Sequence, residues 1–446
     1  MSIIKSIKII YNLNYKELNY FWTSQKIDIY SYKTIESKGI VRGVFRFFKG
    51  MIKELFKKSN KYPDRNTLFF ANTKNQRDVL YPIYQKMQEN NSLFYGISKY
   101  GEYEFNILKA YAISLLFFPL VLIRFLRSKG TEKKAFVYRF DWLWLSYGYY
   151  YFCRDFLKNS KTKILIVAND HTLYARGLTF AANDLGIKTI YVQHASVTAN
   201  FPKLQFSYAF LDGMDALLKY DSVSENSDTV VYLVGISKFD NRKYINKNNI
   251  VRNIGICTNT LDNISLVDEL LNEYKNEKDL TFWLRPHPGD KNFENWKNLA
   301  KKFRVNFSNS KCENTNEFLQ KVDAIIAGET NIHLEAVITN VLPIYYNFSG
   351  QSLRDHYGFI KNNLVENIAY NLKDLNKIFI NLKSVKPNVR YKAKYYSSSI
   401  NTKYDGRSVL LISELLHKLQ NNEEINPDNW EKIKSLKNLV AYKLHQ

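Results

Sequence analysis

The chain has 446 residues, which is enough for two domains of ordinary size. Its composition, 45% hydrophobic and 15% aromatic with only 9 prolines, excludes a disordered chain and predicts large cores. The formal net charge of +22 predicts an acidic partner. Because the lysines are scattered and form no nucleic-acid motif, we expect an anionic membrane surface or an acidic glycan, and no nucleic acid.

The three cysteines, Cys153, Cys257 and Cys312, lie far apart and lack metal-ligand spacing. They predict free thiols in a reducing compartment and no metal site. The N-terminus shows no signal-peptide pattern. We therefore expect a cytoplasmic protein.

Two stretches suggest contact with a membrane. Within a basic N-terminal segment, residues 1–62, the stretch Gly39–Lys58 alternates apolar and cationic residues at helical spacing. Such a helix lies either in a membrane interface or on the core of the protein. The stretch Ala110–Ile123 is apolar, but it is too short to span a bilayer as a helix and contains Pro119. Basic residues follow it, which favours a half-inserted helix over a buried one and a location on the inner membrane.

Residues 63–245 predict a Rossmann-like domain that begins with the buried strand Thr67–Ala71. The later strands 163–168 and 189–192 end in polar residues, and two successive βα units place Asp170, His171 and His194 at one sheet edge. Asp170 and His194 are the candidate catalytic bases. The structural alternatives, a helix cap for Asp170 and a hydrogen-bonded turn for His194, remain open.

Residues 250–385 predict a second Rossmann-like domain, followed by a helical tail, residues 386–446, that crosses back to the first. The apolar run that starts at Leu280 ends in Arg285 and His287, and a proline lies on each side of the histidine. A guanidinium fork and an imidazole on a stiff loop suit a diphosphate. A purely structural role for His287 in the turn is the alternative.

The stretch Ala324–Tyr346 has the pattern of a strand, a turn, a helix and a second strand. A helix N-terminus at the carboxyl end of a parallel strand is where open α/β sheets bind nucleotide phosphates. An ordinary βαβ unit, with Thr330 or Asn331 as the helix cap, is the alternative. The predicted nucleotide contacts here are Gly328, Glu329, Thr330 and Asn331, with Glu335 as a ribose ligand or a solvated acid.

The order of these two motifs resembles the donor domain of bacterial GT-B glycosyltransferases that build capsules and lipopolysaccharide. The likeness is greatest to the sialyltransferase, polysialyltransferase and Kdo-transferase groups, and the CDP-glycerol glycerophosphotransferases of teichoic-acid synthesis share the general pattern. His287 and Pro288 match the His-Pro motif of these groups, and Thr330 and Asn331 stand where they have serines. Asp212 with Gly213 matches their acidic motif in part.

The resemblance implies an α/β GT-B fold, in which two Rossmann-like domains face each other across a cleft. It also implies a metal-independent glycosyltransferase without a cofactor, whose co-substrate is a nucleotide sugar, with a CMP-sugar favoured. The acceptor would be a surface polysaccharide or a lipid-linked glycan of the bacterial cell envelope. Transfer of an alditol phosphate from a CDP-linked donor, a non-catalytic protein that binds glycans or membrane surfaces, and a hexose-nucleotide epimerase are the alternatives.

Overall fold

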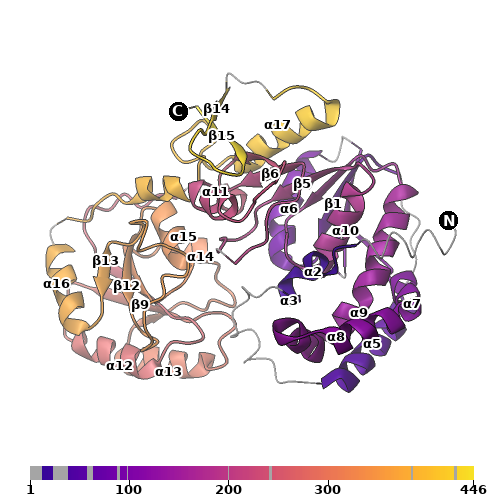
Figure 1. Ribbon diagram of the computed structural model, residues 1–446. Helices are drawn as coiled ribbons and strands as arrows, with labels where there is room; N and C mark the ends of the chain where they lie inside the picture. The colour runs from indigo at the N-terminus through magenta and orange to yellow at the C-terminus, as the bar shows by residue number, and fades with distance from the viewer. Residues whose placement is uncertain are drawn as a thin grey trace. The chain divides into compact units, whose positions relative to one another are not determined.

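The computed structural model describes residues 13–23, 39–57, 64–87, 91–97, 99–198, 200–240, 244–382, 385–425 and 429–445. The isoleucine-rich start of the N-terminal segment lies outside these ranges. The chain divides into two compact units, Met1–Lys238 with Ser408–Gln446, and Phe239–Arg407 (Figure 1). Each unit is described by itself below.

The first unit is built on a nine-stranded sheet of order β14-β15-β7-β6-β5-β4-β1-β2-β3, parallel except for the β14–β15 pair. Because the chain leaves β1 toward β2 and β3 and then returns on the other side to β4, the topological switch point lies between β1 and β4. The strands are β1 Thr67–Ala71, β2 Ser92–Gly96, β3 Tyr103–Glu104, β4 Ile164–Val167, β5 Lys188–Val192, β6 Tyr208–Leu211, β7 Val230–Leu233, β14 Trp430–Lys432 and β15 Val440–Leu444.

Several helices of the first unit pack on one another through aromatic side chains. The long helix α9 (Gly130–Lys158) has a kink at Arg139, and α5, α7 and α10 pack against it. Phe47 of α5 stacks on Trp144 of α9 at 3.8 Å between ring centroids. Besides α9, the helices of this unit are α2 Tyr15–Leu18, α3 Tyr20–Thr23, α5 Gly39–Leu55, α6 Lys74–Met87, α7 Leu108–Leu116, α8 Phe118–Arg127, α10 Leu173–Asn183, α11 Met214–Asp221 and α17 Ser408–Asn421.

The second unit holds a six-stranded parallel sheet of order β10-β9-β8-β11-β12-β13. Here the switch point lies between β8 and β11, which pair directly. The strands are β8 Asn253–Cys257, β9 Thr281–Arg285, β10 Asn306–Phe307, β11 Ala324–Ala327, β12 Leu342–Tyr346 and β13 Asn367–Ala369. The helices are α12 Ile264–Glu273, α13 Phe293–Phe303, α14 Thr315–Leu319, α15 Ile332–Ile338 and α16 Leu372–Leu382, with a 3-10 turn at Arg390–Tyr395. Another 3-10 turn, Ser237–Phe239, lies where the chain passes from the first unit to the second.

Two parallel sheets of Rossmann type confirm the predicted fold class, but two local features differ from the sequence reading. The C-terminal tail is not only helical, because β15 joins the first sheet beside β7 and β14 pairs with it. Asn331 occupies the N-cap of α15, yet its side chain makes no capping hydrogen bond. Its backbone is already helical there (φ −64°, ψ −13°), whereas a capping side chain usually needs an extended N-cap.

The apolar stretch Ala110–Ile123 forms two helices, α7 and α8, bent by 65° at a break beside Phe117. Pro119 lies in the first turn of α8, where its missing N–H costs no helical hydrogen bond. Among the described residues, no single helix is long and apolar enough to cross a bilayer, and α7 with α8 meets that test only as a bent pair.

Candidate functional site

Asp170 lies at the carboxyl end of β4, beside the switch point of the first sheet, and only 1% of its side chain is exposed. Both carboxylate oxygens have partners: Oδ1 lies 2.8 Å from Nδ1 of His171, and Oδ2 accepts a hydrogen bond from the Tyr220 hydroxyl at 2.6 Å. Burial raises the pKa of Asp170, but hydrogen bonds from His171 and Tyr220 and the charge of Arg176 outweigh it. The pKa therefore lies below its usual value.

The neighbouring His171 is oriented by these contacts. Asn169 Oδ1 accepts hydrogen bonds from the backbone N–H groups of His171 and Thr172 and from the Thr172 hydroxyl. The Asn169 amide nitrogen therefore faces the imidazole and lies 3.3 Å from its Nε2. The pattern assigns the proton to Nδ1, toward Asp170, and points the Nε2 lone pair at the Asn169 amide, which an acceptor hydroxyl would have to displace. About a fifth of the His171 side chain is exposed, so this pair has the orientation that a general base requires.

His194 follows β5, the neighbour of β4, so the two strands bring it to the same edge as Asp170. Burial, with a smaller contribution from the neighbouring His171, lowers the pKa of His194 to about 4, and Asp170 opposes this shift only in part. Its Nδ1 is buried without a hydrogen-bond partner in the described structure. At neutral pH His194 is thus a neutral imidazole beside the Asp170–His171 pair. The predicted catalytic role of Asp170 and His194 stays a prediction.

Asp212, at the end of β6, extends this edge. Its backbone N–H donates to Oε1 of Gln193 at 2.9 Å, and burial raises the pKa of its carboxyl well above the ordinary value. Asp212 is also buried, whereas about a fifth of the His171 side chain is exposed. Among these edge residues, His171 therefore has the exposure and the imidazole nitrogen that suit proton transfer.

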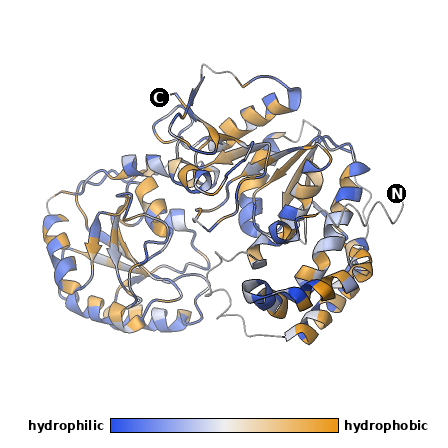
Figure 2. Cartoon of the chain, viewed as in Figure 1, coloured by the Kyte–Doolittle hydropathy of each residue, from blue (hydrophilic) through white to orange (hydrophobic). Residues whose placement is uncertain are grey.

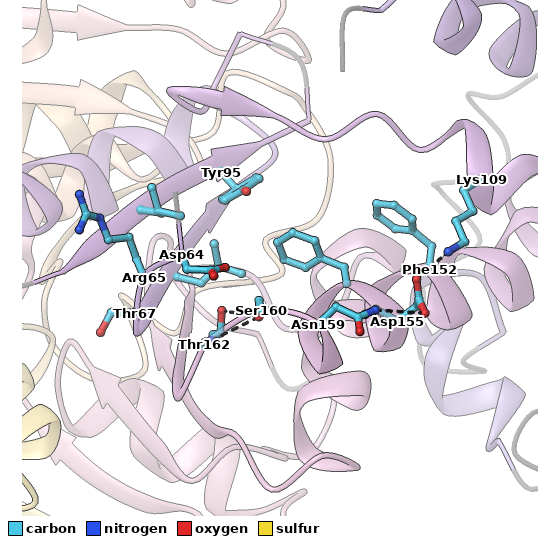
Figure 3. A pocket seen from close by; sticks show the side chains of 13 residues that line it. Asp64, Arg65, Thr67, Tyr95, Lys109, Phe152, Asp155, Asn159, Ser160 and Thr162 are labelled. Carbon is cyan, nitrogen blue, oxygen red and sulfur yellow. Dashed lines mark hydrogen bonds and ion pairs between the residues drawn. The ribbon is translucent and has the colours of Figure 1, made fainter. Parts of the chain in front are cut away.

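A cavity of about 310 Å³ lies at the opposite, amino end of the same strands, next to Thr67 of β1 (Figure 3). Several polar groups in its lining pair with each other: Lys109 with Asp155 at 2.6 Å, and Ser160 with Thr162 at 2.9 Å. Ligands of open α/β sheets bind outside the carboxyl ends of the strands. We therefore place the candidate site at the other edge, not in this cavity.

In the second unit, the residues that follow β8 and β11 flank the switch point. The Thr258 hydroxyl and Oδ1 of Asp262 are buried and have no hydrogen-bond partner among the described residues. A Cβ atom at Gly328 would lie 3.4 Å from that same Asp262 oxygen. Burial raises the pKa of Asp262 to about 6, against a hydrogen bond from the Asn259 backbone. Unpaired polar atoms around a residue without a side chain are typical of a ligand site.

His287 lies on the loop after β9 with an exposed side chain, as the prediction for a phosphate contact requires. Its Nδ1 accepts a hydrogen bond from the backbone N–H of Gly289 at 3.1 Å. Since Nδ1 is an acceptor, the neutral ring carries its proton on Nε2, which becomes a donor. Two flanking prolines hold the loop, so this donor is available at the carboxyl edge of the sheet.

Arg285 is buried, and its guanidinium donates to the Ser308 hydroxyl at 2.6 Å and to the Glu313 backbone carbonyl at 3.0 Å. The Glu313 carboxylate lies 3.5 Å away, and the guanidinium sits over the Phe318 ring. These contacts tie the end of β9 to the 308–318 segment. With its guanidinium held by these partners, Arg285 positions the loop that carries His287. The predicted direct contact of Arg285 with a phosphate stays a prediction.

The turn after β11 holds the remaining predicted residues. Glu329 Oε1 accepts a hydrogen bond from the His356 backbone at 3.0 Å, and Glu329 and Thr330 line a small pocket with Gly328. His333 is buried, with Nε2 at 2.8 Å from the Gly328 carbonyl, and burial lowers its pKa to about 4. Glu335 is half-buried, and its charge raises the pKa of Arg285, which burial lowers. No contact of Asn331 or Glu335 identifies a ligand.

The described parts of the chain contain no group of three or more His, Cys, Asp or Glu side chains that could hold a metal ion. The metal-independent reaction stays a prediction. From the sequence, His171 is placed at the first edge without being chosen as a catalytic base, and Thr258–Thr260, after the strand that begins at Val251, is a possible phosphate turn. Asp262 was not predicted. Its one signal is its position in the loop after that strand, which many loop residues with no role share.

No protein-family model and no curated protein matches this chain. Its structure is similar to UDP-GlcNAc 2-epimerase from Neisseria meningitidis bound to UDP-GlcNAc, with 13% identity, a TM-score of 0.52, and coverage of 79% of this chain and 100% of that one. Another UDP-N-acetylglucosamine 2-epimerase gives 11% identity, a TM-score of 0.50, and coverage of 82% and 99%. These likenesses, with the two Rossmann-like units, support the GT-B fold and nothing finer.

The wall teichoic acid polymerase TagF gives 13% identity and covers 86% of this chain and 98% of its own, but its TM-score is 0.47. At that score the likeness carries no argument about fold or activity.

Proposed function

We propose that this protein is a glycosyltransferase that moves a sugar from a nucleotide-activated donor to an acceptor hydroxyl, with a CMP-sugar as the favoured donor. The observation that carries the proposal is the Asp170–His171 pair at the switch point of the first sheet. A buried carboxylate holds the imidazole in the tautomer whose Nε2 can accept a proton.

In the proposed reaction the acceptor oxygen forms a bond to the anomeric carbon, while the bond from that carbon to the phosphate oxygen breaks. The acceptor proton passes to Nε2 of His171, and the nucleotide leaves with the electron pair. Asp170 acts as a positioning residue that stabilises the imidazolium. His194, neutral at physiological pH, supplies a second polar group on the acceptor side.

The second unit is proposed to bind the donor. The Nε2–H of His287 donates to the phosphate, and the Thr258 hydroxyl gives a second contact at the switch point between β8 and β11. Asp262 is better suited to a ribose hydroxyl than to a phosphate, because two anions would repel each other. Gly328 leaves room for the ligand to approach the backbone.

The proposed acceptor is a surface-polysaccharide or lipid-linked glycan, as the motif resemblance implies, and the proposed location is the cytoplasmic face of the inner membrane. The net charge of +22 supports an anionic acceptor or surface. Transfer from a CDP-linked alditol keeps the same fold and is separated from glycosyl transfer by the donor that reacts.

The test is a thermal-shift panel of CMP, CDP, UDP and GDP, followed by incubation with the matching nucleotide sugars. Binding at about a hundred times the dissociation constant adds roughly 2.7 kcal/mol to stability. We expect a shift with a cytidine nucleotide, its weakening in His287→Ala, and release of that nucleotide from its sugar donor.

Two results would overturn the proposal. If no nucleotide stabilises the chain, the donor site is wrong and a non-catalytic binding protein becomes the better reading. If UDP-GlcNAc is converted to its C2 epimer with no release of UDP, the protein is an epimerase, the activity named for the structural neighbours of similar fold.

A further inference from the structure

Helix α5 carries two apolar faces, one packed against α9 and one largely exposed. The inner face presents Gly43 to the backbone of α9 and Phe47 to the Trp144 ring. The outer face repeats apolar residues at intervals of three and four positions, all exposed: Val41, Phe45, Phe48, Ile52 and Leu55, with Phe56 just beyond the helix. A helix that is apolar on both faces normally has a partner on each.

The bent pair α7–α8 adds a second set of exposed apolar side chains next to this stripe. They are Leu115, Leu116, Leu122, Ile123 and Leu126. The helices that carry the two sets are neighbours: α5 packs on α7, and both α5 and α8 contact Trp144 of α9. Phe48 of α5 lies edge-on to the Trp144 ring at 6.0 Å, and Phe118, the first residue of α8, lies 4.8 Å from it. Figure 2 shows the alternation of hydrophobic and hydrophilic residues along these helices. We refer to these eleven residues of α5, α7 and α8 as the three-helix surface.

More than half of the large apolar side chains that the described residues leave exposed belong to this surface. The others are scattered singly over the rest of the chain, which is normal for a folded protein. A group of exposed apolar side chains on neighbouring helices is different, because exposing a large apolar patch to water is unfavourable unless a partner covers it.

The charges around the three-helix surface are cationic. Its exposed basic side chains are Arg42, Lys49, Lys53, Arg127, Lys129 and Lys134. The sequences of α7 and α8 contain no acidic residue, and the single acid of α5, Glu54, is buried against Lys57 and the Ile107 N–H. The surface therefore presents apolar side chains and positive charge without an exposed carboxylate from its own helices.

We infer that the three-helix surface docks the first unit on an anionic phospholipid bilayer, with the helices lying in the interface. A cationic rim around apolar side chains matches the acidic headgroups and acyl boundary of such a bilayer. A second copy of this chain is a poorer occupant, since it would bring the same positive charges against this rim. The inner faces of α5, α7 and α8 stay packed on α9, so the surface lies on the membrane and does not unfold into it.

The experiment is flotation of the full chain with vesicles of phosphatidylcholine alone, and with vesicles in which about a third of the lipid is phosphatidylglycerol. We expect binding to the anionic vesicles, weakened when salt rises from about 0.1 M to about 1 M, where the screening length falls from roughly 10 to 3 Å. Equal binding to neutral vesicles at both salt concentrations would overturn the anionic specificity, and absence of binding to either would overturn the inference.

Variants locate the contact. Phe45→Ser with Leu116→Ser removes side chains that are 72% and 74% exposed, and should lower the partition coefficient about tenfold or more. Leu261→Ser with Ile380→Ser removes side chains of 70% and 69% exposure in the second unit and should change nothing. An equal effect of both pairs, or none from the first, contradicts the inference. Unchanged melting temperatures confirm that the variants fold.

A double charge-reversal variant and a measurement of the molecular mass in solution complete the test. Lys49→Glu with Lys53→Glu should abolish the preference for anionic vesicles, whereas Lys275→Glu with Lys278→Glu in the second unit should leave it. If the wild-type chain is instead a dimer that becomes a monomer in the Phe45→Ser, Leu116→Ser variant and binds no vesicle, a second copy covers the surface and the inference is wrong. None of these outcomes depends on the nucleotide donor or on catalysis, so they fail or succeed separately from the proposed function.

Discussion

The carboxyl edges of the two sheets share one strand topology but differ in how their polar side chains are satisfied. At the first edge, the Asp170 carboxylate has hydrogen-bonding groups on both oxygens, although Nδ1 of His194 is buried without a partner in the described structure. At the second edge, the Thr258 hydroxyl and one Asp262 oxygen are buried without partners, and the His287 side chain is exposed.

The difference separates two chemical tasks. A pre-formed network fixes the tautomer and the orientation of one group, which is what proton transfer needs. Unsatisfied buried polar atoms cost stability until a ligand pairs with them, which is what a binding site offers. The first edge thus suits chemistry and the second suits donor binding, and the following substitutions test that division.

The largest effect is expected for His171→Asn. Removing the lone pair on Nε2 should lower kcat about 10²- to 10⁴-fold, because this is the usual contribution of a general base. The stabilisation by nucleotide in a thermal-shift assay should not change, since the donor contacts lie in the second unit. The control is His445→Asn, a substitution of an exposed histidine after β15. An unchanged kcat in His171→Asn would show that His171 is not the general base.

The second effect is a pH dependence of stability in the first unit. His194 has a pKa of about 4 in the folded chain against 6.5 in the unfolded chain. Below pH 6.5 the unfolded chain gains a proton that the folded chain does not accept until about pH 4. The free energy of unfolding is therefore highest above pH 6.5 and falls between pH 6.5 and pH 4. The loss at pH 5 is about 2 kcal/mol. Hydrogen exchange of the β5 amides at pH 7 and pH 5 measures it, and His194→Gln should abolish this part of the loss.

The second edge should respond in the opposite direction through Asp262. Its folded pKa of about 6 lies above the unfolded value of 3.8, so the folded carboxyl gains a proton first as the pH falls through 6. Acidification to pH 5 should therefore stabilise the second unit by about 1 kcal/mol through this group. Asp262→Asn should remove the gain, measured by hydrogen exchange of the β8 amides. A loss of protection in the wild type that Asp262→Asn relieves would contradict the assignment.

An effect of similar size, about tenfold in the nucleotide dissociation constant, is expected for His287→Gln. One charge-assisted hydrogen bond to phosphate is lost, and about 1.4 kcal/mol corresponds to that factor. With a slow chemical step, KM should rise while kcat stays close to its original value. A fall in kcat with constant KM would instead show that His287 acts in the chemical step and not in donor binding.

Most of the sheet framework could be predicted, because buried parallel strands are continuous apolar runs. The bounds predicted for Thr67–Ala71 agree with β1, and the first strand predicted within Ala324–Tyr346 is β11. The strands β14 and β15 could not be read in the same way. Val440–Leu444 mixes polar and apolar residues, and its pairing with β7 joins segments about two hundred residues apart.

The candidate site was predictable as a place but not as a set of contacts. Strand ends showed that Asp170 and His194 share an edge, since the order of βα units determines it. The Tyr220 hydroxyl on Asp170 comes from a residue 50 positions later, and the Ser308 hydroxyl on Arg285 from one 23 positions later. Such partners depend on packing between elements, and without them the sequence could not tell a base from a positioning residue.

The smallest effect tests the network behind His171. Tyr220→Phe removes the hydroxyl that lies 2.6 Å from Oδ2 of Asp170 and leaves the Oδ1 contact with His171 in place. A carboxylate with one donor fewer is more basic and should hold the imidazolium more strongly, so the acidic limb of the pH–rate profile should move to higher pH. Loss of one buried hydrogen bond of about 1 kcal/mol should lower kcat no more than about tenfold. A variant that loses stability but keeps the position of that limb would show that Tyr220 only packs, and that Asp170 positions His171 without it.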